Sequence, residues 1–304
     1  MKSKNSANIE GFTRGWNWFW NIVAALVAFA CIMPFVFTII ISLTEEKSLT
    51  RNGYRIWPEQ WSFSAYSYLL EDSGQMLNSF LVSILITVLG VIISLLLILP
   101  YAYAISRSEF AYRKLFTFIA FLTMLFNAGL VPFYMMVTQV LHMKDTIWAL
   151  ILPLSVNAFY IIVMRTFYKT TIEEGMIEAA KIDGAGDFSI FVRMVLPISL
   201  PGIATIGLFS ALAYWNDWFN AMLFIDKPEL TPLQYMLSRI QNNLQYLLEN
   251  TDSLSTSDAS LIANLPQETI RMAMVVVATA PIVLAYPFFQ RFFIQGLTVG
   301  SIKG

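Results

Sequence analysis

The chain has 304 residues, of which 57% are hydrophobic and 13% are charged, and its formal net charge is -1. This composition excludes an ordinary soluble domain, in which about 25% of residues are charged. The near-neutral charge also gives no basis for a nucleic-acid partner, which requires a strongly basic surface. Cys31 is the single cysteine, so no disulfide forms within the chain. We therefore expect an integral membrane protein.

Six apolar stretches are each long enough to cross a bilayer as a helix, which takes about 20 apolar residues. Pro281 and Pro287 lie in the last stretch and are expected to break its helix. The sequence thus predicts an all-α protein with six transmembrane helices. The predicted spans cover residues 18–42, 76–105, 115–140, 147–168, 198–225 and 270–293.

The first span follows a polar segment and three tryptophans, Trp16, Trp18 and Trp20. Tryptophan at the start of an apolar run is typical of the lipid headgroup layer. A signal peptide is the alternative interpretation, but this stretch is too long for one and lacks a small-residue cleavage site. We expect it to be retained.

The basic residues predict how the spans are oriented. Six spans place both termini on one side, which would hold twelve of the 19 Lys and Arg residues, mostly in short segments. The other side would hold seven. Because Lys and Arg are enriched in cytoplasmic segments, both termini are predicted to be cytoplasmic, and so is the loop between spans 4 and 5.

That loop, residues 171–201, is polar within a mostly apolar chain. Thr171 and Glu174 have the spacing of a capping box, which predicts a helix starting at Ile172. The Gly-Ala-Gly run at residues 184–186 should end this helix, because glycine tolerates the left-handed conformation found there.

A second short helix is predicted directly after this turn. Asp187 can cap it, it should cover residues 188–195, and Pro197 should end it. A short helix, a sharp turn and a second helix would suit the docking of another protein. In that interpretation Ile177 and Ile182 offer apolar contact, and Lys181 offers a hydrogen-bond donor. A loop that only connects two spans is the alternative.

The same loop resembles the EAA loop of ABC importer permeases. Glu178-Ala179-Ala180, Gly184 and Leu196-Pro197 stand at the fixed positions of that motif. Met194 stands where the family usually has Ile, and its similar volume preserves a packing role. The resemblance is to the carbohydrate-uptake branch and is good over residues 77–293 but loose before them.

The resemblance implies a transport subunit, not an enzyme, with its own domain arrangement. Residues 1–75 would form the cytoplasmic N-terminus, first span and first outer loop, residues 76–293 the type-1 permease domain, and residues 294–304 a cytoplasmic tail. The loop would act as a coupling helix that engages the ATPase. Its coupling residues would be Glu178, Ala179, Ala180, Asp183, Gly184 and Ala185.

The resemblance also implies partner chains. No G-x-x-x-x-G-K-[ST] loop occurs in the sequence, so ATP and Mg²⁺ would bind to two separate ATP-binding cassette subunits and no cofactor to this chain. A homologous second permease would complete a heterodimer in the cell membrane. An extracytoplasmic solute-binding protein would dock on the acidic outer loop, residues 226–269; a merely solvated loop is the alternative.

An ion gradient is disfavoured as the energy source. Asp217 is the only clear ionisable residue within a span, whereas ion-coupled carriers bury several. No inverted repeat between the chain halves is evident either. A passive channel remains an alternative. A membrane enzyme is another, but it would need an acid, base or metal set around Asp217.

The fifth span carries a polar and aromatic cluster that would suit a sugar pathway. Trp rings stack on sugar CH faces, while amide and carboxylate groups bond hydroxyls. On a continuous helix Asn216 and Asn220 would share a face, with Asp217 beside it. Alternatively, these groups only bond other helices and the rings form an interface belt. The candidate pathway residues are Tyr214, Trp215, Asn216, Asp217, Trp218 and Asn220.

Other polar residues are expected to be structural. Asn78, Asn127 and Asn157 are interpreted as contacts between helices. His142 is interpreted as a turn residue, because nothing in the sequence gives it metal-ligand spacing, and no metal site is expected. The expected substrate is an oligosaccharide or polysaccharide fragment, on the resemblance of the C-terminal end to this branch. A non-sugar solute is the alternative.

Overall fold

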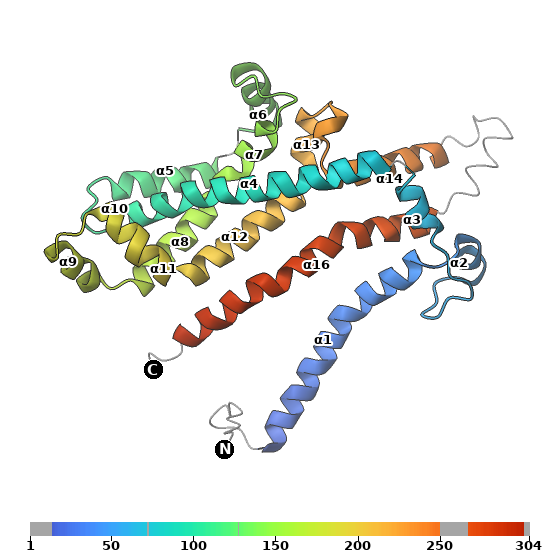
Figure 1. The fold of residues 1–304 in the computed structure, drawn as a ribbon, viewed down its shortest axis with the longest axis horizontal. Coiled ribbons are helices and arrows are strands. Elements are labelled where there is room, and N and C mark those ends of the chain that lie inside the picture. Colours follow the sequence, from blue (N-terminus) through green and yellow to red (C-terminus); the bar gives the residue numbers. More distant parts are fainter. Residues whose placement is uncertain (1–13, 72, 127, 250–266, 301–304) are drawn as a thin grey trace. The chain divides into compact units, whose positions relative to one another are not determined.

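The computed structural model describes residues 14–71, 73–126, 128–249 and 267–300 (Figure 1). These residues are helical except for turns and one isolated bridge between Thr44 and Trp61, which confirms the all-α class. The chain divides into two compact units. One comprises residues 1–71 and 251–277, the other residues 72–250 and 278–304.

The first unit contains α1 (Arg14–Ser42), α2 (Glu46–Asn52), α3 (Ser64–Leu69) and the start of α16 (Gln267–Gly300). The Glu46 carboxylate accepts hydrogen bonds from the backbone N–H groups of Glu268 and Thr269, at 3.1 and 3.0 Å. A carboxylate there satisfies the unpaired donors of a helix start and complements its dipole. Glu46 thereby links α2 to the first described turn of α16.

The second unit is built around α4 (Ser73–Ser106). This helix packs against α8 (Ala158–Thr171) and α12 (Leu200–Trp215), and also against α5 (Arg113–Leu125) and α7 (Trp148–Ser155) (Figure 1). Such long apolar faces bury against one another because each helix satisfies its own backbone hydrogen bonds.

The predicted third span, residues 115–140, is not one helix. It consists of α5, α6 (Leu130–Met135) and a π-helical turn, Met136–Val140, with a bend of 115° between the two halves. Gly129, at the break, has a φ of +87°. That left-handed conformation is accessible to glycine and stops the helix from continuing.

Two further predicted spans are also interrupted. α7 and α8 meet at a bend of 46°, where the Asn157 side chain caps α8 by accepting from the Phe159 N–H at 2.9 Å. In the fifth, α12 ends at Trp215 and α13 (Phe219–Phe224) follows after a turn. In the fourth predicted span, the polar side chain of Asn157 therefore serves to start a helix.

The predicted break of the sixth span at Pro281 and Pro287 is wrong. α16 runs through both prolines as one helix. Each proline removes a single backbone N–H donor from the helix. In an apolar environment no water competes for the remaining backbone N–H and C=O groups, so they keep their helical hydrogen bonds.

Three helical segments are long and apolar enough to cross a membrane unbroken: Trp16–Ser42, Gly74–Ser106 and Gln267–Pro287. The bent pairs raise the number of candidates to as many as six, by length and composition, within the described residues. The architecture is therefore that of a helical membrane protein with several apolar helices.

The predicted outer loop, residues 226–269, contains more structure than expected. A 3₁₀ turn (Pro228–Leu230) leads into α14 (Leu233–Glu249). The Leu233 N–H donates to Ser83 Oγ at 2.8 Å, and Asn78 Nδ2 donates to the Glu229 carbonyl at 3.0 Å. Asn78 is thus a structural contact. Residues 250–266 lie outside the described residues.

Tyr214 of α12 sits against the α4 backbone at Gly90. A Cβ at Gly90 would lie 2.5 Å from the Tyr214 ring. The ring is held there because its hydroxyl donates to the Ile151 carbonyl at 2.9 Å and also bonds Ser94 Oγ at 3.2 Å. Glycine is therefore required at position 90 for α4 and α12 to approach.

We predict that Gly90→Ala destabilises the protein by about 1–3 kcal/mol, the usual range for overpacking a filled core. Thermal unfolding in detergent measures this as a lowered Tm. Gly175→Ala is the matched control, because no atom lies within 4 Å of a Cβ there. An equal Tm for both variants would contradict the packing described.

Candidate functional site

The EAA-like loop folds as α9 (Glu174–Ile182), but not with the predicted start. The N-cap residue is Glu173, and no side chain caps the helix. Thr171 is the last residue of α8, and Ile172 follows in extended backbone, buried in the core. The predicted capping box is wrong because Ile172 is held in extended backbone by the burial of its side chain. The predicted first helical turn therefore cannot form.

The predicted end of the helix is confirmed. Gly184 has a φ of +85°, the left-handed conformation. The Ala185 N–H donates to the Ala180 carbonyl and the Gly184 N–H to the Lys181 carbonyl, both at 3.0 Å. This pattern is a Schellman-type end, which satisfies the last helical carbonyls and turns the chain sharply.

The second helix differs from the prediction at both ends. Its N-cap is Gly186, and Asp187 is already in the first turn of α10 (Asp187–Ile190). A π-helical turn, Phe191–Val195, and α11 (Leu196–Ile198) then carry the chain through Pro197. The π turn already departs from the regular α-helical hydrogen-bond pattern. The missing backbone N–H of Pro197 therefore does not end the helix. The chain instead bends by 80° before α12.

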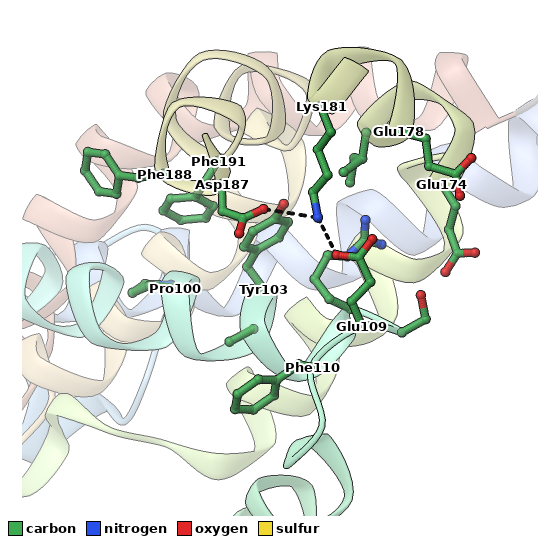
Figure 2. Close-up of a pocket in the computed structure, with 14 residues that line it drawn as sticks. Pro100, Tyr103, Glu109, Phe110, Glu174, Glu178, Lys181, Asp187, Phe188 and Phe191 are labelled. Carbon is green, nitrogen blue, oxygen red and sulfur yellow. Dashed lines mark hydrogen bonds and ion pairs between the residues drawn. The ribbon is translucent and has the colours of Figure 1, made fainter. Parts of the chain in front are cut away.

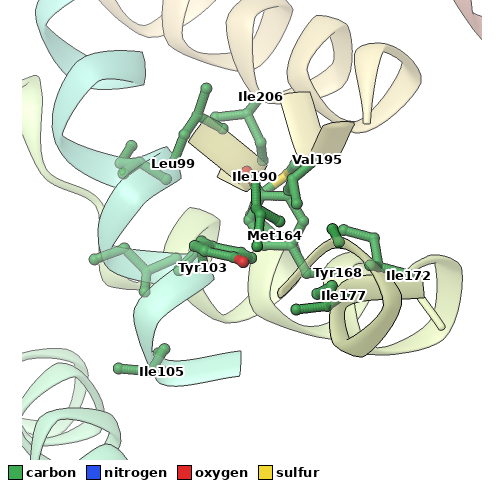
Figure 3. Close-up of a cluster of buried hydrophobic side chains, with 14 residues drawn as sticks. Leu99, Tyr103, Ile105, Met164, Tyr168, Ile172, Ile177, Ile190, Val195 and Ile206 are labelled. Atoms are coloured by element: carbon green, nitrogen blue, oxygen red, sulfur yellow. The ribbon is translucent and has the colours of Figure 1, made fainter. Parts of the chain in front are cut away.

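One face of α9 is locked into the protein. Ile177 and Ala180 are 4% and 8% exposed and belong to a cluster with Tyr103 of α4 and Met164 and Tyr168 of α8 (Figure 3). Ile177 is therefore not available to a partner, contrary to the interpretation from sequence. The inner side chains of α9 therefore share one packed cluster with the ends of these two long helices.

The opposite face of this element is exposed and unusually apolar for a polar loop. Ile182 is 85% exposed and Phe188 is 80% exposed, on either side of the Gly184 turn. Glu178 and Ala179 are exposed beside them, as are Glu174, Asp183 and Gly184, while Ala185 is half-buried. Two large apolar side chains with carboxylates around them form a surface suited to protein contact.

Lys181 ties α9 to its own chain. Its ammonium group forms ion pairs with Glu109, in the loop between α4 and α5, and with Asp187 at 3.3 Å (Figure 2). The Lys181 ammonium group, a donor to another protein in the interpretation from sequence, is therefore paired within this chain. The same residues line a cavity of about 500 Å³ together with Arg107 and Phe191.

The hydrogen bond to Glu109 raises the pKa of Lys181 above its ordinary value. A raised pKa means that the ion pair makes its full contribution to the stability of the folded state at any pH below the usual lysine pKa of about 10.4. The contribution is lost only as the pH rises through the raised value. At neutral pH the tie between α9 and the α4–α5 loop is therefore complete.

The predicted pathway cluster is divided by the turn after α12. Tyr214 and Trp215 are buried, and Trp215 Nε1 donates to the Ala278 carbonyl at 2.9 Å. Asn216 donates to the Leu212 carbonyl at 2.9 Å. The first three residues of the cluster are thus engaged in packing or in finishing a helix.

Asp217 and Asn220 bond each other rather than lining a common helix face. Asp217 accepts from the Asn220 N–H at 3.1 Å and from Asn220 Nδ2 at 2.8 Å. The assumption that Asn216 and Asn220 share a face is wrong, because residues 216–218 are not helical. Trp218 is 44% exposed and packs edge-on against Phe219.

Asn220 lines a cavity of about 1310 Å³ in the second unit. Phe219 and Pro153 also line it, and most of its remaining wall comes from the broken third span, including Gly129 and Phe133. Sequence reasoning missed this wall. The available signal was the Gly129 and Pro132 pair, which interrupts an otherwise apolar run.

The remaining polar residues have local roles. His142 is exposed in a turn and has a φ of +50°, and Asn157 caps α8. Asn127 lies outside the described residues.

Three comparisons place these features among known proteins. Residues 12–299 match the model of a family described as "Binding-protein-dependent transport system inner membrane component". The chain is 36% identical over 279 residues to the polygalacturonan/rhamnogalacturonan transport system permease protein YtcP of Bacillus subtilis (strain 168), covering 92% of this chain and 95% of YtcP. It is 36% identical over 273 residues to protein LplC of the same organism, covering 90% of each.

The fold also matches a solved structure. A chain in the crystal structure of a bacterial ABC transporter involved in the import of the acidic polysaccharide alginate superposes with a TM-score of 0.76 and 30% identity. The match covers 93% of this chain and 99% of that chain. The similarity therefore includes the N-terminal part, which the sequence motif alone did not cover.

We predict that Glu109→Lys loosens α9, because it replaces the main partner of Lys181 with a like charge. Hydrogen exchange of amides 174–187 should accelerate about two- to five-fold, the modest effect expected of an exposed ion pair. Adding Lys181→Glu restores opposite charges between residues 109 and 181 and should slow exchange again, but not to the wild-type rate, because Glu at 181 would lie beside Asp187. Exchange that is unchanged in both variants would show that the ion pair does not hold α9.

Proposed function

Since the chain belongs to the binding-protein-dependent transport system inner membrane component family, we propose that it is the permease subunit of an ATP-driven sugar importer. The observation that carries this proposal is the two-sided α9. Its inner face is packed against α4 and α8, and its outer face presents Ile182 among exposed carboxylates. The family consists of membrane transport components and not of enzymes.

In this proposal α9 is the coupling helix. ATP binding closes two ATPase subunits, and Glu178, Ala179 and residues 183–185 follow that movement because they contact the ATPase. Ala180, predicted as a coupling residue, lies on the buried face instead. Ile177 and Ala180 pass the displacement to α4 and α8 through the buried cluster. The translocation pathway then alternates between outward-facing and inward-facing states.

The proposed topology has six spans, counting each interrupted helix pair as one, with both termini and α9 in the cytoplasm. The excess of Lys and Arg on that side supports this orientation. A homologous second permease and an extracytoplasmic solute-binding protein complete the assembly. ATP and Mg²⁺ bind to the ATPase subunits.

The proposed substrate is an oligosaccharide or polysaccharide fragment. YtcP is named for a polygalacturonan and rhamnogalacturonan transport system, and the structurally similar transporter is described as involved in the import of alginate. Within this chain, Trp218 and Asn220 are the members of the predicted cluster best placed to meet substrate. Trp218 exposes much of its ring, and Asn220 lines the cavity at the broken third span.

We predict that Ile182→Asp and Glu178→Lys each abolish ATPase docking while leaving the permease folded. Both side chains are exposed, so stability should change by no more than about 0.5 kcal/mol. Loss of a central apolar contact or charge should lower the amount of co-purified ATPase at least about tenfold. Quantitative mass spectrometry of the affinity-purified chain measures this, with sugar uptake assayed in parallel.

Glu229→Lys is the matched control, because it reverses an exposed charge in the predicted outer loop. It should leave ATPase recovery unchanged. Normal ATPase recovery and uptake in the Ile182→Asp and Glu178→Lys variants would contradict the coupling role and leave a passive channel as the better account.

We predict that proteoliposomes holding the full transporter take up labelled oligosaccharides from acidic or neutral polysaccharides. Trp218→Ala should reduce that uptake about tenfold, since it removes an exposed aromatic contact, with ATPase recovery unaffected. Trp57→Ala, which removes an exposed tryptophan outside the fifth span, is the control. Exclusive uptake of amino acids or metal chelates would refute the sugar assignment.

A further inference from the structure

A small pocket between the start of α5 and the end of α8 is dominated by basic residues. It has a volume of about 480 Å³, and four of its seven lining residues are Arg113, Lys114, Arg165 and Lys169. The other three are Thr117, Phe118 and Phe121, so no carboxylate lines it.

The charges of this pocket are not neutralised by the chain. None of the four basic residues forms an ion pair with a carboxylate in the part of the chain that the structure describes. Arg165 is positioned by a backbone contact, its Nε donating to the Ile105 carbonyl at 3.3 Å. Four cations around one pocket repel each other, and a bound anion would relieve that repulsion.

Of the described residues that line these two cavities, the acidic ones belong to the adjoining cavity. That cavity shares Arg113 and Lys169 with the basic pocket and is also lined by Glu173 and Glu174. Arg107 extends the basic wall into it, and its Nε is buried without a hydrogen-bond partner. The two glutamates therefore mark the border of the basic pocket and not its interior.

The order of residues along α5 identifies the kind of anion. Arg113 and Lys114 begin the helix, and Phe121 lies about 12 Å further along it at a rise of 1.5 Å per residue. On α8, Arg165 and Lys169 occupy its last two turns. Cations at one end and exposed aromatic rings at the other match a phospholipid, whose phosphate lies at the membrane surface above its acyl chains.

We propose that the pocket formed by Arg113, Lys114, Arg165 and Lys169 binds the headgroup of an anionic phospholipid, with the acyl chains lying over Phe118 and Phe121. A free phosphate would satisfy the cations but leave these rings uncovered. Because α8 leads directly into α9, the lipid anchors the base of the element that carries the candidate site at the membrane surface.

Native mass spectrometry of the full-length chain in non-ionic detergent tests this proposal without any transport assay. Phosphatidylglycerol and phosphatidylcholine with identical acyl chains are titrated against the wild type and against Lys114→Gln/Lys169→Gln. Both substituted residues are exposed. Phosphatidylglycerol should bind the double variant about 25-fold more weakly, since each basic residue near an anionic headgroup strengthens binding roughly fivefold.

Three further arms make the result specific. Lys114→Arg/Lys169→Arg should retain the wild-type affinity for phosphatidylglycerol, which excludes a folding defect at these positions. Lys47→Gln/Arg51→Gln, which removes the same charge between α1 and α3, should also retain it. Inorganic phosphate at 100-fold excess, on the order of what a weak competitor needs, should not displace the lipid.

Equal phosphatidylglycerol affinity in the wild type and the Gln double variant would overturn the proposal. So would equal affinity for phosphatidylcholine, or displacement by inorganic phosphate. A loss of co-purified protein subunits in the Gln variant, with lipid binding unchanged, would assign the pocket to an acidic protein segment instead.

Discussion

The burial of Ile177 and Ala180 against Tyr103, Met164 and Tyr168 is the contact on which the rest of the structure depends. It joins a nine-residue surface helix to two helices that run into the apolar body of the protein. Protein interiors are densely packed, so a displacement of α9 cannot be absorbed locally and must shift its neighbours.

The two faces of α9 therefore have separate tasks within one short segment. Both faces carry a small side chain. Ala180 lets the inner face lie close to α4 and α8, and Ala179 leaves room for another surface to approach the outer face closely. Gly184 then reverses the chain so that Phe188 comes to the outer surface. The ion pairs of Lys181 add a polar link from this helix to Glu109 and Asp187.

The sequence predicted the helical class, the positions of the apolar segments and the Gly184 turn, because these follow from composition, run length and a backbone preference. It did not predict which side of α9 faces inward, since Ile177 and Ile182 have the same chemistry and only tertiary packing distinguishes them. The capping box at Thr171 failed because burial of Ile172 outweighs one side-chain hydrogen bond. The shared face of Asn216 and Asn220 failed because Asp217 bonds Asn220 and starts a new helix. α14 was missed within a polar segment, although its buried residues Leu233, Leu237 and Leu244 recur at helical spacing.

The central claim is that the exposed face of α9 lies in the cytoplasm and touches an ATPase. The most direct measurement is labelling of a cysteine at position 179, in a Cys31→Ser background, by a membrane-impermeant maleimide. The account predicts that Ala179→Cys is labelled in inside-out vesicles but not in intact spheroplasts, and that bound ATPase protects it. Labelling from the outside of spheroplasts, or labelling in vesicles that ATPase leaves unchanged, would contradict the account.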